Sequence, residues 1–323
     1  MSGLNHKAPI QLSVLIPIYN EEEGLPDLLG QVVKACEQTG LSFEVIICND
    51  GSSDSSEQIV VTKRAQDPRI KLISLSRNFG HHPAMQAGMD LCRGEGVILM
   101  DGDFQDPPGM IPALVQKWKE GYDIVCTRKL SRKDPWARRW FFRGFYRLFS
   151  SLSSIRLEPG VGIFSLLDRR PLEVLKRMPE RNKYLVGMRT LLGFRQVVLE
   201  FERPERLYGG ARQTLSRLFR LAFDAIFSFS TLPIQIVWGL GVVGICFSFL
   251  GILYVLYDKL VRGTALIGWS STMISILFLG SVQLIGIGII GEYLVRISED
   301  VRQRPYYVIR RAEGFGPEGG VPT

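Results

Sequence analysis

Two long stretches without a charged side chain dominate the second half of this sequence. They run from Leu232 to Tyr257 and from Ala265 to Gly291, separated only by the loop DKLVRGT. Each is long enough to cross the hydrocarbon core of a bilayer, which takes roughly 20 apolar residues in a helix. A loop this short makes the two helices antiparallel. We therefore predict a two-helix transmembrane hairpin over residues 231–296, in preference to a pair of buried helices in a soluble protein.

Basic residues orient this hairpin. Arginines lie on both sides of it, while the loop carries only two basic residues; they are Arg203, Arg206, Arg212, Arg217 and Arg220 before it, Arg296, Arg302, Arg304, Arg310 and Arg311 after it, and Lys259 and Arg262 in the loop. The positive-inside rule places both chain ends in the cytoplasm. The N-terminus MSGLNHKAPI lacks the apolar stretch of a signal peptide, and the five cysteines are scattered,. We expect a multi-pass protein of the cell inner (plasma) membrane.

The first half of the chain alternates short apolar runs with helix-length segments. LSVLIPI, FEVIICN, IKLISLS, GVILMD and YDIVCTR are predicted strands, and the segments near 24–38, 54–65, 81–92 and 109–120 are predicted helices,. This order is typical of βαβ units, so the predicted fold is α/β with a Rossmann-like, mostly parallel sheet. Ligands of such sheets bind at the carboxyl ends of the strands. Asn20, Asp50 and Asp101 all fall there.

Two further segments have the pattern of amphipathic helices. Residues 135–152 place aromatic and aliphatic side chains on one face and Arg139, Arg143 and Arg147 on another,. Residues 211–230 repeat this pattern immediately before the hairpin. Such helices lie in a membrane interface, although a core helix with a solvated basic face has the same pattern. With the formal charge of +7, they indicate anionic membrane lipid as a partner,.

The run DGDFQDPP, residues 101–108, carries the clearest chemistry. It puts Asp101 and Asp103 one residue apart directly after an apolar strand. Such a pair can hold a hard divalent cation and leave positions for phosphate oxygens. An isolated Asp-x-Asp is more often a solvated turn, but its place after a fourth parallel strand favours the metal site.

Other turns are less specific. NDGSSD, residues 49–54, suits a tight turn with helix capping, while Asp50 is placed to accept hydrogen bonds from a base or ribose,. Residues 1–210 contain no GxGxxG or GxxxxGK[ST] run, which disfavours dinucleotide or ATP binding by this half of the chain,. His81 and His82 begin a helix, where packing or capping is favoured over a role near a diphosphate.

Five motifs occur together in the order PIYNEEEG, NDGSSDSS, SRNFGHHPA, DGDFQDPP and PERNKYLVG, followed by the two apolar stretches. In this combination the chain resembles the polyprenyl-phosphate glycosyltransferases of glycosyltransferase family 2, and most of all their bacterial two-span glucosyl transferase branch. The resemblance covers roughly residues 12–307. It implies a GT-A catalytic domain over residues 1–210, a juxtamembrane helix over 211–230, the hairpin over 231–296 and a cytoplasmic tail over 297–323.

The resemblance also implies roles for individual residues. Pro17, Tyr19, Glu21 and Asp50 would line the nucleotide pocket. Asp101 and Asp103 would hold Mg²⁺ or Mn²⁺ and the diphosphate, with Gln105 nearby. Arg128 and Arg212 would be the cations near phosphate. Arg212 stands where the family usually has a lysine, and an arginine keeps the charge while changing its geometry.

The chain departs from the family pattern at one acceptor-side run. Where relatives have Gly-Asp-Phe-Arg or Gly-Ser-Phe-Arg, this chain has Gly162, Ile163, Phe164 and Ser165, so that the acid and the arginine are both missing. The metal pair is intact.

The implied activity is an inverting transfer of a sugar from a nucleotide-sugar, UDP-glucose or another UDP-sugar, to undecaprenyl phosphate or a close relative. A catalytically altered protein that binds lipid phosphate or scaffolds partners is the alternative. A flippase is disfavoured, since two spans without an intramembrane charge make a poor transport path. The glycines of both spans favour a homo-oligomer, and nucleic acid is not expected as a partner.

Overall fold

The structure, a computed structural model, describes residues 9–130, 160–178, 185–202, 232–257, 260–261, 268–302 and 304–315. These residues fall into a unit built around a β-sheet and a unit of two long helices. The predicted amphipathic helices at 135–152 and 211–230 lie outside the described residues, and so does Arg212.

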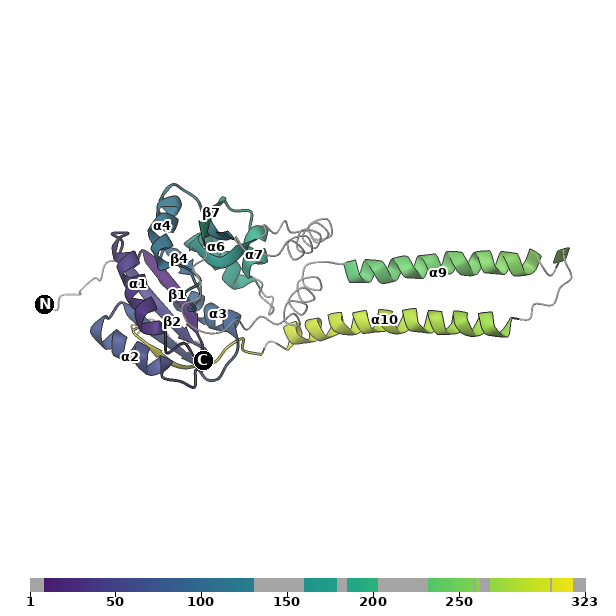
Figure 1. The fold of residues 1–323 in the computed structure, drawn as a ribbon, viewed down its shortest axis with the longest axis horizontal. Coiled ribbons are helices and arrows are strands. Elements are labelled where there is room, and N and C mark those ends of the chain that lie inside the picture. Colours follow the sequence, from purple (N-terminus) through teal and green to yellow (C-terminus); the bar gives the residue numbers. More distant parts are fainter. Residues whose placement is uncertain are drawn as a thin grey trace. The chain divides into compact units, whose positions relative to one another are not determined.

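The sheet unit contains eight strands in the order β7-β5-β6-β4-β1-β2-β3-β8 (Figure 1). Their bounds are β1 Leu12–Ile18, β2 Phe43–Asn49, β3 Ile70–Leu75, β4 Gly96–Leu99, β5 Ile124–Leu130, β6 Val161–Asp168, β7 Gln196–Glu202 and β8 Ile309–Glu313. Only β6 and β8 run antiparallel to their neighbours. The predicted α/β fold with a mostly parallel sheet is therefore confirmed, as a mixed sheet.

The central strands are apolar because both faces of the sheet are covered. Every residue of β1, β2 and β3 is buried, as expected for parallel strands between two helical layers. The β1–β2 register pairs Leu12 with Phe43 and Ile18 with Asn49. The loops after β1, β2, β3 and β4 consequently leave the sheet at one edge.

Helices form a layer on each face. One hydrophobic cluster joins the sheet to α1 (Leu25–Glu37), α2 (Ser56–Gln66) and α4 (Ile111–Lys119), which follows a short 3-10 turn, η1 (Pro108–Met110). A second cluster joins it to α3 (His81–Leu91), α6 (Arg169–Arg177) and α7 (Leu185–Leu191). Close packing of α3 requires Gly88, since a Cβ there would lie 2.8 Å from Cys48 Sγ.

The segment predicted as a C-terminal tail supplies β8, which pairs antiparallel with β3. Side chains reinforce this strand. Arg64 Nη1 lies 3.0 Å from Glu313 Oε2, Arg310 Nη2 lies 2.6 Å from Glu57 Oε2, and the Tyr307 hydroxyl donates to Asp90 Oδ2 at 2.8 Å. The sheet thus takes its last edge strand from beyond the two long helices.

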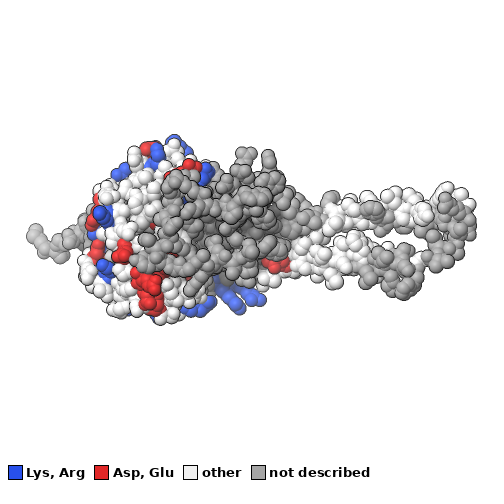
Figure 2. Space-filling view, viewed as in Figure 1, with Lys and Arg blue, Asp and Glu red and all other residues white. Residues whose placement is uncertain are grey.

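Those helices are α9 (Leu232–Tyr257) and α10 (Trp269–Val301), which lie side by side and antiparallel (Figure 1). A Cβ at Gly286 would lie 3.2 Å from Val237 Cγ1, so this glycine permits close packing of the pair. Large apolar side chains such as Leu250 and Leu284 are exposed, and the described outer surface of the pair shows few charges (Figure 2).

Within the described residues, one helix is long and apolar enough to cross a membrane. Its apolar window is Phe278–Val295 in α10, with a mean hydropathy of 1.7. In α9 the corresponding apolar stretch, Gly239–Gly251, is shorter. The two-helix transmembrane hairpin is therefore not confirmed, and the second span stays a prediction.

Candidate active site

Asp101 and Asp103 lie in a tight loop, residues 101–106, that follows β4. Phe104 adopts a left-handed φ of 58°, which turns the chain back within the loop. The Asp101 N–H donates to Asp106 Oδ2 at 2.9 Å, and the Gln105 N–H donates to Asp103 Oδ1 at 3.1 Å. A Cβ at residue 102 would lie 3.0 Å from the Pro17 carbonyl oxygen, so the glycine there lets the loop rest on the end of β1.

His81 contacts the first of the two carboxylates. Its Nε2 lies 2.9 Å from Asp101 Oδ1. Burial opposes a charge on His81, but the hydrogen bond to Asp101 and the charges of Asp101, Asp103 and Asp106 outweigh it and raise the pKa of His81. Burial likewise opposes the charge of Asp101, yet its pKa is lowered because His81 and Lys129 stabilise the carboxylate.

Asp106 and Lys129 complete this group, and neither was predicted from the sequence. The Asp106 side chain is 1% exposed, and Lys129 Nζ lies 2.9 Å from its Oδ1. Burial and the nearby charge of Asp101 raise the pKa of Asp106 to about 6 despite this ion pair. The QDP segment of the carboxylate run was the available signal for Asp106. Lys129 gave none, because a lysine at a strand end is usually solvated.

Arg128, the predicted phosphate cation, forms an ion pair with an acid of β7. It pairs with Glu200 across the parallel β5–β7 register, and its Nη1 lies 3.1 Å from Glu200 Oε1. Successive residues of a strand point to opposite faces, which separates Arg128 from Lys129. In the described residues, the structure therefore brings Lys129 to the carboxylate loop and pairs Arg128 with an acid of β7.

Asp50 is buried at the end of β2, with 3% exposure. Its Oδ1 accepts from the Phe79 N–H at 2.7 Å, and its Oδ2 accepts from the Gly80 N–H at 2.9 Å. Burial raises its pKa, although these two hydrogen bonds counteract the effect. Each carboxylate oxygen has lone pairs left, so a ligand contact is compatible with this geometry.

The other predicted nucleotide residues lie along β1 and the loop after it. Pro17 is buried in β1, while Tyr19 is 45% exposed. The Glu21 N–H donates to Ser56 Oγ at 3.0 Å, which ties this loop to the start of α2. All three residues and Asp50 therefore belong to the edge of the sheet that carries Asp101.

The run Gly162–Ser165, where the family acid and arginine are missing, lies in β6 beside a buried arginine. Arg189 of α7 is 1% exposed. Its Nη2 donates to the Gly162 carbonyl at 2.6 Å, its Nη1 donates to the Ile163 carbonyl at 3.1 Å, and Nη1 also donates to Ser165 Oγ. The sequence did not predict this residue, since an arginine that donates to carbonyl oxygens leaves no pattern of paired charges.

The carboxylate loop suits a cation that is bound together with a phosphorylated ligand. Among the described residues, no group of three or more His, Cys, Asp and Glu side chains could hold a metal by itself. Mg²⁺ commonly binds through one or two carboxylates plus substrate phosphates, and Asp101 and Asp103 provide that donor set. Beside them, Gln105 Nε2 is buried without an acceptor in the described part of the chain.

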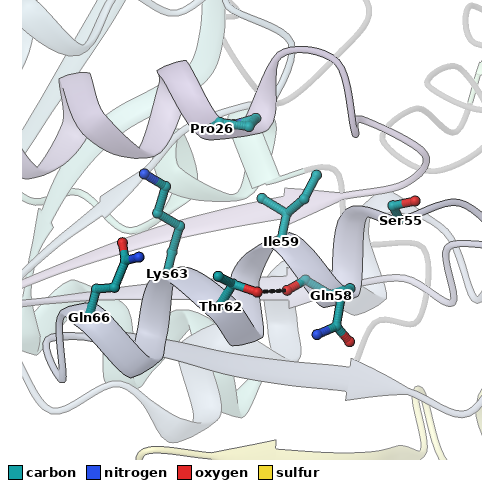
Figure 3. A pocket seen from close by; sticks show the side chains of 7 residues that line it. All are labelled: Pro26, Ser55, Gln58, Ile59, Thr62, Lys63 and Gln66. Atoms are coloured by element: carbon teal, nitrogen blue, oxygen red, sulfur yellow. Dashed lines mark hydrogen bonds between the residues drawn. The ribbon is translucent and has the colours of Figure 1, made fainter.

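A separate groove lies between α1 and α2 (Figure 3). It measures about 240 Å³ and is lined by Pro26, Ser55, Gln58, Ile59, Thr62, Lys63 and Gln66. None of these residues contributes to the carboxylate loop, and we assign no function to the groove.

Comparison with known proteins identifies the family. Residues 13–175 match Glycosyl transferase family 2. A glucosyl-3-phosphoglycerate synthase from Mycobacterium tuberculosis, solved with Mn²⁺, UDP and phosphoglyceric acid, is 17% identical. Its superposition covers 68% of this chain and 76% of that one, with a TM-score of 0.49. That likeness is too weak to carry an argument.

Relatives of similar length are much closer in sequence. An SfII prophage-derived bactoprenol glucosyl transferase from Shigella flexneri is 37% identical over 95% of this chain and 100% of its own length. A prophage bactoprenol glucosyl transferase homolog from Escherichia coli K12 is 36% identical over 94% of this chain and 100% of its own length. An uncharacterized glycosyltransferase from Synechocystis is 37% identical over 93% of this chain and 95% of its own length. The chain belongs to glycosyl transferase family 2.

Proposed function

We propose that this protein transfers a sugar from a nucleotide-sugar to a polyprenyl phosphate at the cytoplasmic face of a membrane, with inversion at the anomeric carbon. UDP-glucose is the proposed donor and undecaprenyl phosphate the proposed acceptor. The carboxylate loop carries this proposal, because Asp101 and Asp103 lie at the sheet edge where an α/β fold binds its ligands,. The names of the bactoprenol glucosyl transferase relatives support the choice of acceptor and sugar.

In this proposal, Asp101 and Asp103 hold Mg²⁺ or Mn²⁺ against the donor diphosphate. A cation bound there would offset the charge that develops on the leaving nucleoside diphosphate. Pro17, Tyr19, Glu21 and Asp50 surround the nucleotide. Gln105 is the proposed donor to a phosphate or sugar oxygen, because its buried Nε2 has no acceptor in the described part of the chain.

The acceptor does not need a protein base. A phosphate monoester has a second pKa of about 6, so near neutral pH its attacking oxygen is already largely an anion. Catalysis then depends on positioning and on charge. Ile163 can thus replace an acid without loss of function. Arg128 and Arg212 are proposed to hold the acceptor phosphate in line with the leaving group, while Lys129 keeps positive charge beside the carboxylate loop.

The path of the chain supports two membrane spans. β3 and β8 pair within one sheet, yet α9 and α10 lie between them in sequence. A chain that leaves a folded unit and returns to it must cross a bilayer an even number of times. If α10 spans the membrane, the chain needs a second span, and we assign it to α9, which leaves both termini on the side of the catalytic domain. We propose that this side is the cytoplasm, as the arginines flanking the hairpin indicate.

Reconstitution tests this function. Full-length protein in vesicles with undecaprenyl phosphate and Mn²⁺ would receive a panel of labelled nucleotide-sugars, and label entering the lipid phase would be counted. We expect transfer from UDP-glucose in the wild type and none in Asp103→Asn. Sealed inside-out membranes should accept the donor, whereas right-side-out membranes should not. If no sugar is transferred across the panel while lipid phosphate still binds, the protein is a binding or scaffold protein.

A further inference from the structure

The bond between His81 and Asp101 spans a wide part of the sheet edge. His81 follows β3, whereas Asp101 follows β4, and the order β4-β1-β2-β3 leaves two strands between them. The loop after β3 must therefore lean over the ends of β1 and β2 to bring His81 Nε2 within 2.9 Å of Asp101 Oδ1. Something has to hold that loop in place.

Asp50 provides that support from the end of β2. Its two carboxylate oxygens each accept a backbone N–H of the loop, from Phe79 and from Gly80. The next residue, Gly51, has a φ of 70°, and a Cβ there would lie 2.6 Å from the Arg77 carbonyl carbon. The loop thus rests directly on the β2 turn. Gly80, with a φ of 106°, then directs the chain into α3.

Asp101 is consequently fixed at two points. Its side chain receives the His81 hydrogen bond on Oδ1, and its backbone N–H donates to Asp106 Oδ2. An ionised carboxylate only accepts hydrogen bonds, so His81 Nε2 carries the proton. Since His81 engages Oδ1, Oδ2 of Asp101 is the oxygen that we assign to the cation. Groups that orient a metal ligand in this way commonly change metal affinity 10- to 100-fold when removed.

We propose that His81 is the positioning residue for the metal carboxylate Asp101, and that Asp50 acts on the metal site through the loop that carries His81. This inference rests on the proposed function, since it concerns the cation of the transfer reaction. It assigns Asp50 a second role in addition to the proposed contact with the nucleotide. The proposed path starts at Asp50, passes through the Phe79 and Gly80 N–H groups to His81, and ends at Asp101.

The experiment measures Mn²⁺ binding to full-length protein by electron paramagnetic resonance, with and without UDP, alongside transfer. His81→Phe should weaken Mn²⁺ binding 10- to 100-fold in both conditions. His81→Gln should restore most of the affinity, because its amide nitrogen reaches the position of Nε2. His82→Phe, the same change one residue later, serves as the control and should bind Mn²⁺ as the wild type does.

A double-mutant cycle tests the role of Asp50. Asp50→Asn should weaken Mn²⁺ binding in the wild type but add little in the His81→Phe background, because residues acting through one path are not additive. Fully additive effects would overturn the path. Unchanged Mn²⁺ affinity in His81→Phe, or an effect seen only with UDP, would overturn the positioning role while leaving the proposed function intact. A wild type that neither binds Mn²⁺ nor transfers sugar would instead refute the proposed function. Thermal unfolding of each variant identifies any loss of the fold, and His81→Gln then carries the test.

Discussion

Lys129 of β5 forms an ion pair of 2.9 Å with Asp106, a carboxylate that is almost wholly buried in the loop after β4. The pair also bears on Asp101, because Asp106 in turn accepts the N–H of Asp101. Asp101 and its loop are therefore held by residues from three strand ends.

We expect Lys129→Met to reduce transfer at least 10-fold, because Asp106 would lose its counterion and its hold on the Asp101 N–H would change. Lys129→Arg keeps the charge and should retain most of the activity. The rate at saturating donor and Mn²⁺ is the measurement. Wild-type activity in Lys129→Met would show that the pair has no part in the reaction.

Asp103→Asn should lower transfer by at least 100-fold while leaving the protein folded, since it removes a hard anionic ligand for the cation. Circular dichroism and the thermal midpoint should match those of the wild type. Full activity at saturating Mn²⁺ would contradict the assignment of this carboxylate.

Nucleoside diphosphate and metal should strengthen each other's binding. Two carboxylates complete a cation site only with phosphate oxygens from a ligand, so we expect UDP to raise the affinity for Mn²⁺ by about 10-fold or more, and Mn²⁺ to raise the affinity for UDP by the same factor. Calorimetry in both orders of addition measures this coupling. Uridine, which lacks phosphates, is the control and should leave Mn²⁺ binding unchanged.

Removal of the last strand should destabilise the sheet unit. A chain ending after residue 304 loses β8, the ion pair of Glu313 with Arg64 and the hydrogen bond from Tyr307 to Asp90. It also exposes the edge of β3, a pairing site for other chains. We expect a lower thermal midpoint and aggregation in detergent solution. A chain ending after residue 315 keeps the strand and should behave as the wild type.

The pair of Asp67 and Arg69 gives a pH-dependent contribution away from the active site. Hydrogen bonds from Arg69 lower the pKa of Asp67 below its ordinary value of 3.8, although partial burial opposes them. Stabilisation from a lowered carboxyl pKa is present above that ordinary value and is lost as pH falls through the folded-state pKa. Because Arg69 is 39% exposed, solvent screening limits the effect to about 0.5–1 kcal/mol.

Asp67→Asn should accordingly lower the thermal midpoint, and the difference from the wild type should stay constant between pH 5 and pH 7. Below about pH 4 the difference should shrink, because the wild type then loses the stabilisation from Asp67 as well. Thermal unfolding across this range is the measurement. A difference that grows on acidification would contradict the sign of this prediction.

Strands that are buried on both faces could be predicted from the sequence. LSVLIPI and FEVIICN match β1 and β2 in full, because a parallel strand between two helical layers is a continuous apolar run,. β8 could not be predicted in this way. Its sequence IRRAE shows little alternation between apolar and polar residues, and its exposed arginines suit a strand with one free edge,.

The residues of the candidate site that lie together in one sequence motif could be predicted. The residues that the fold brings together from separate segments could not. Asp101 and Asp103 follow one apolar strand, and the fold confirms that this strand, β4, lies parallel to β1 and ends at the expected edge of the sheet. His81 and Lys129 come from other strand ends, and only the three-dimensional structure brings them to the carboxylate loop. The role proposed for each of these residues stays a prediction.

The pairing of β8 with β3 has a consequence for biosynthesis. Domains generally fold while the chain is still being made, but β8 follows both long helices in the sequence, so it can join the sheet only after α9 and α10 have been made. Until then the edge of β3 that pairs with β8 stays unpaired. A complete sheet therefore requires that the chain, after α9 and α10, returns to the sheet unit that it left.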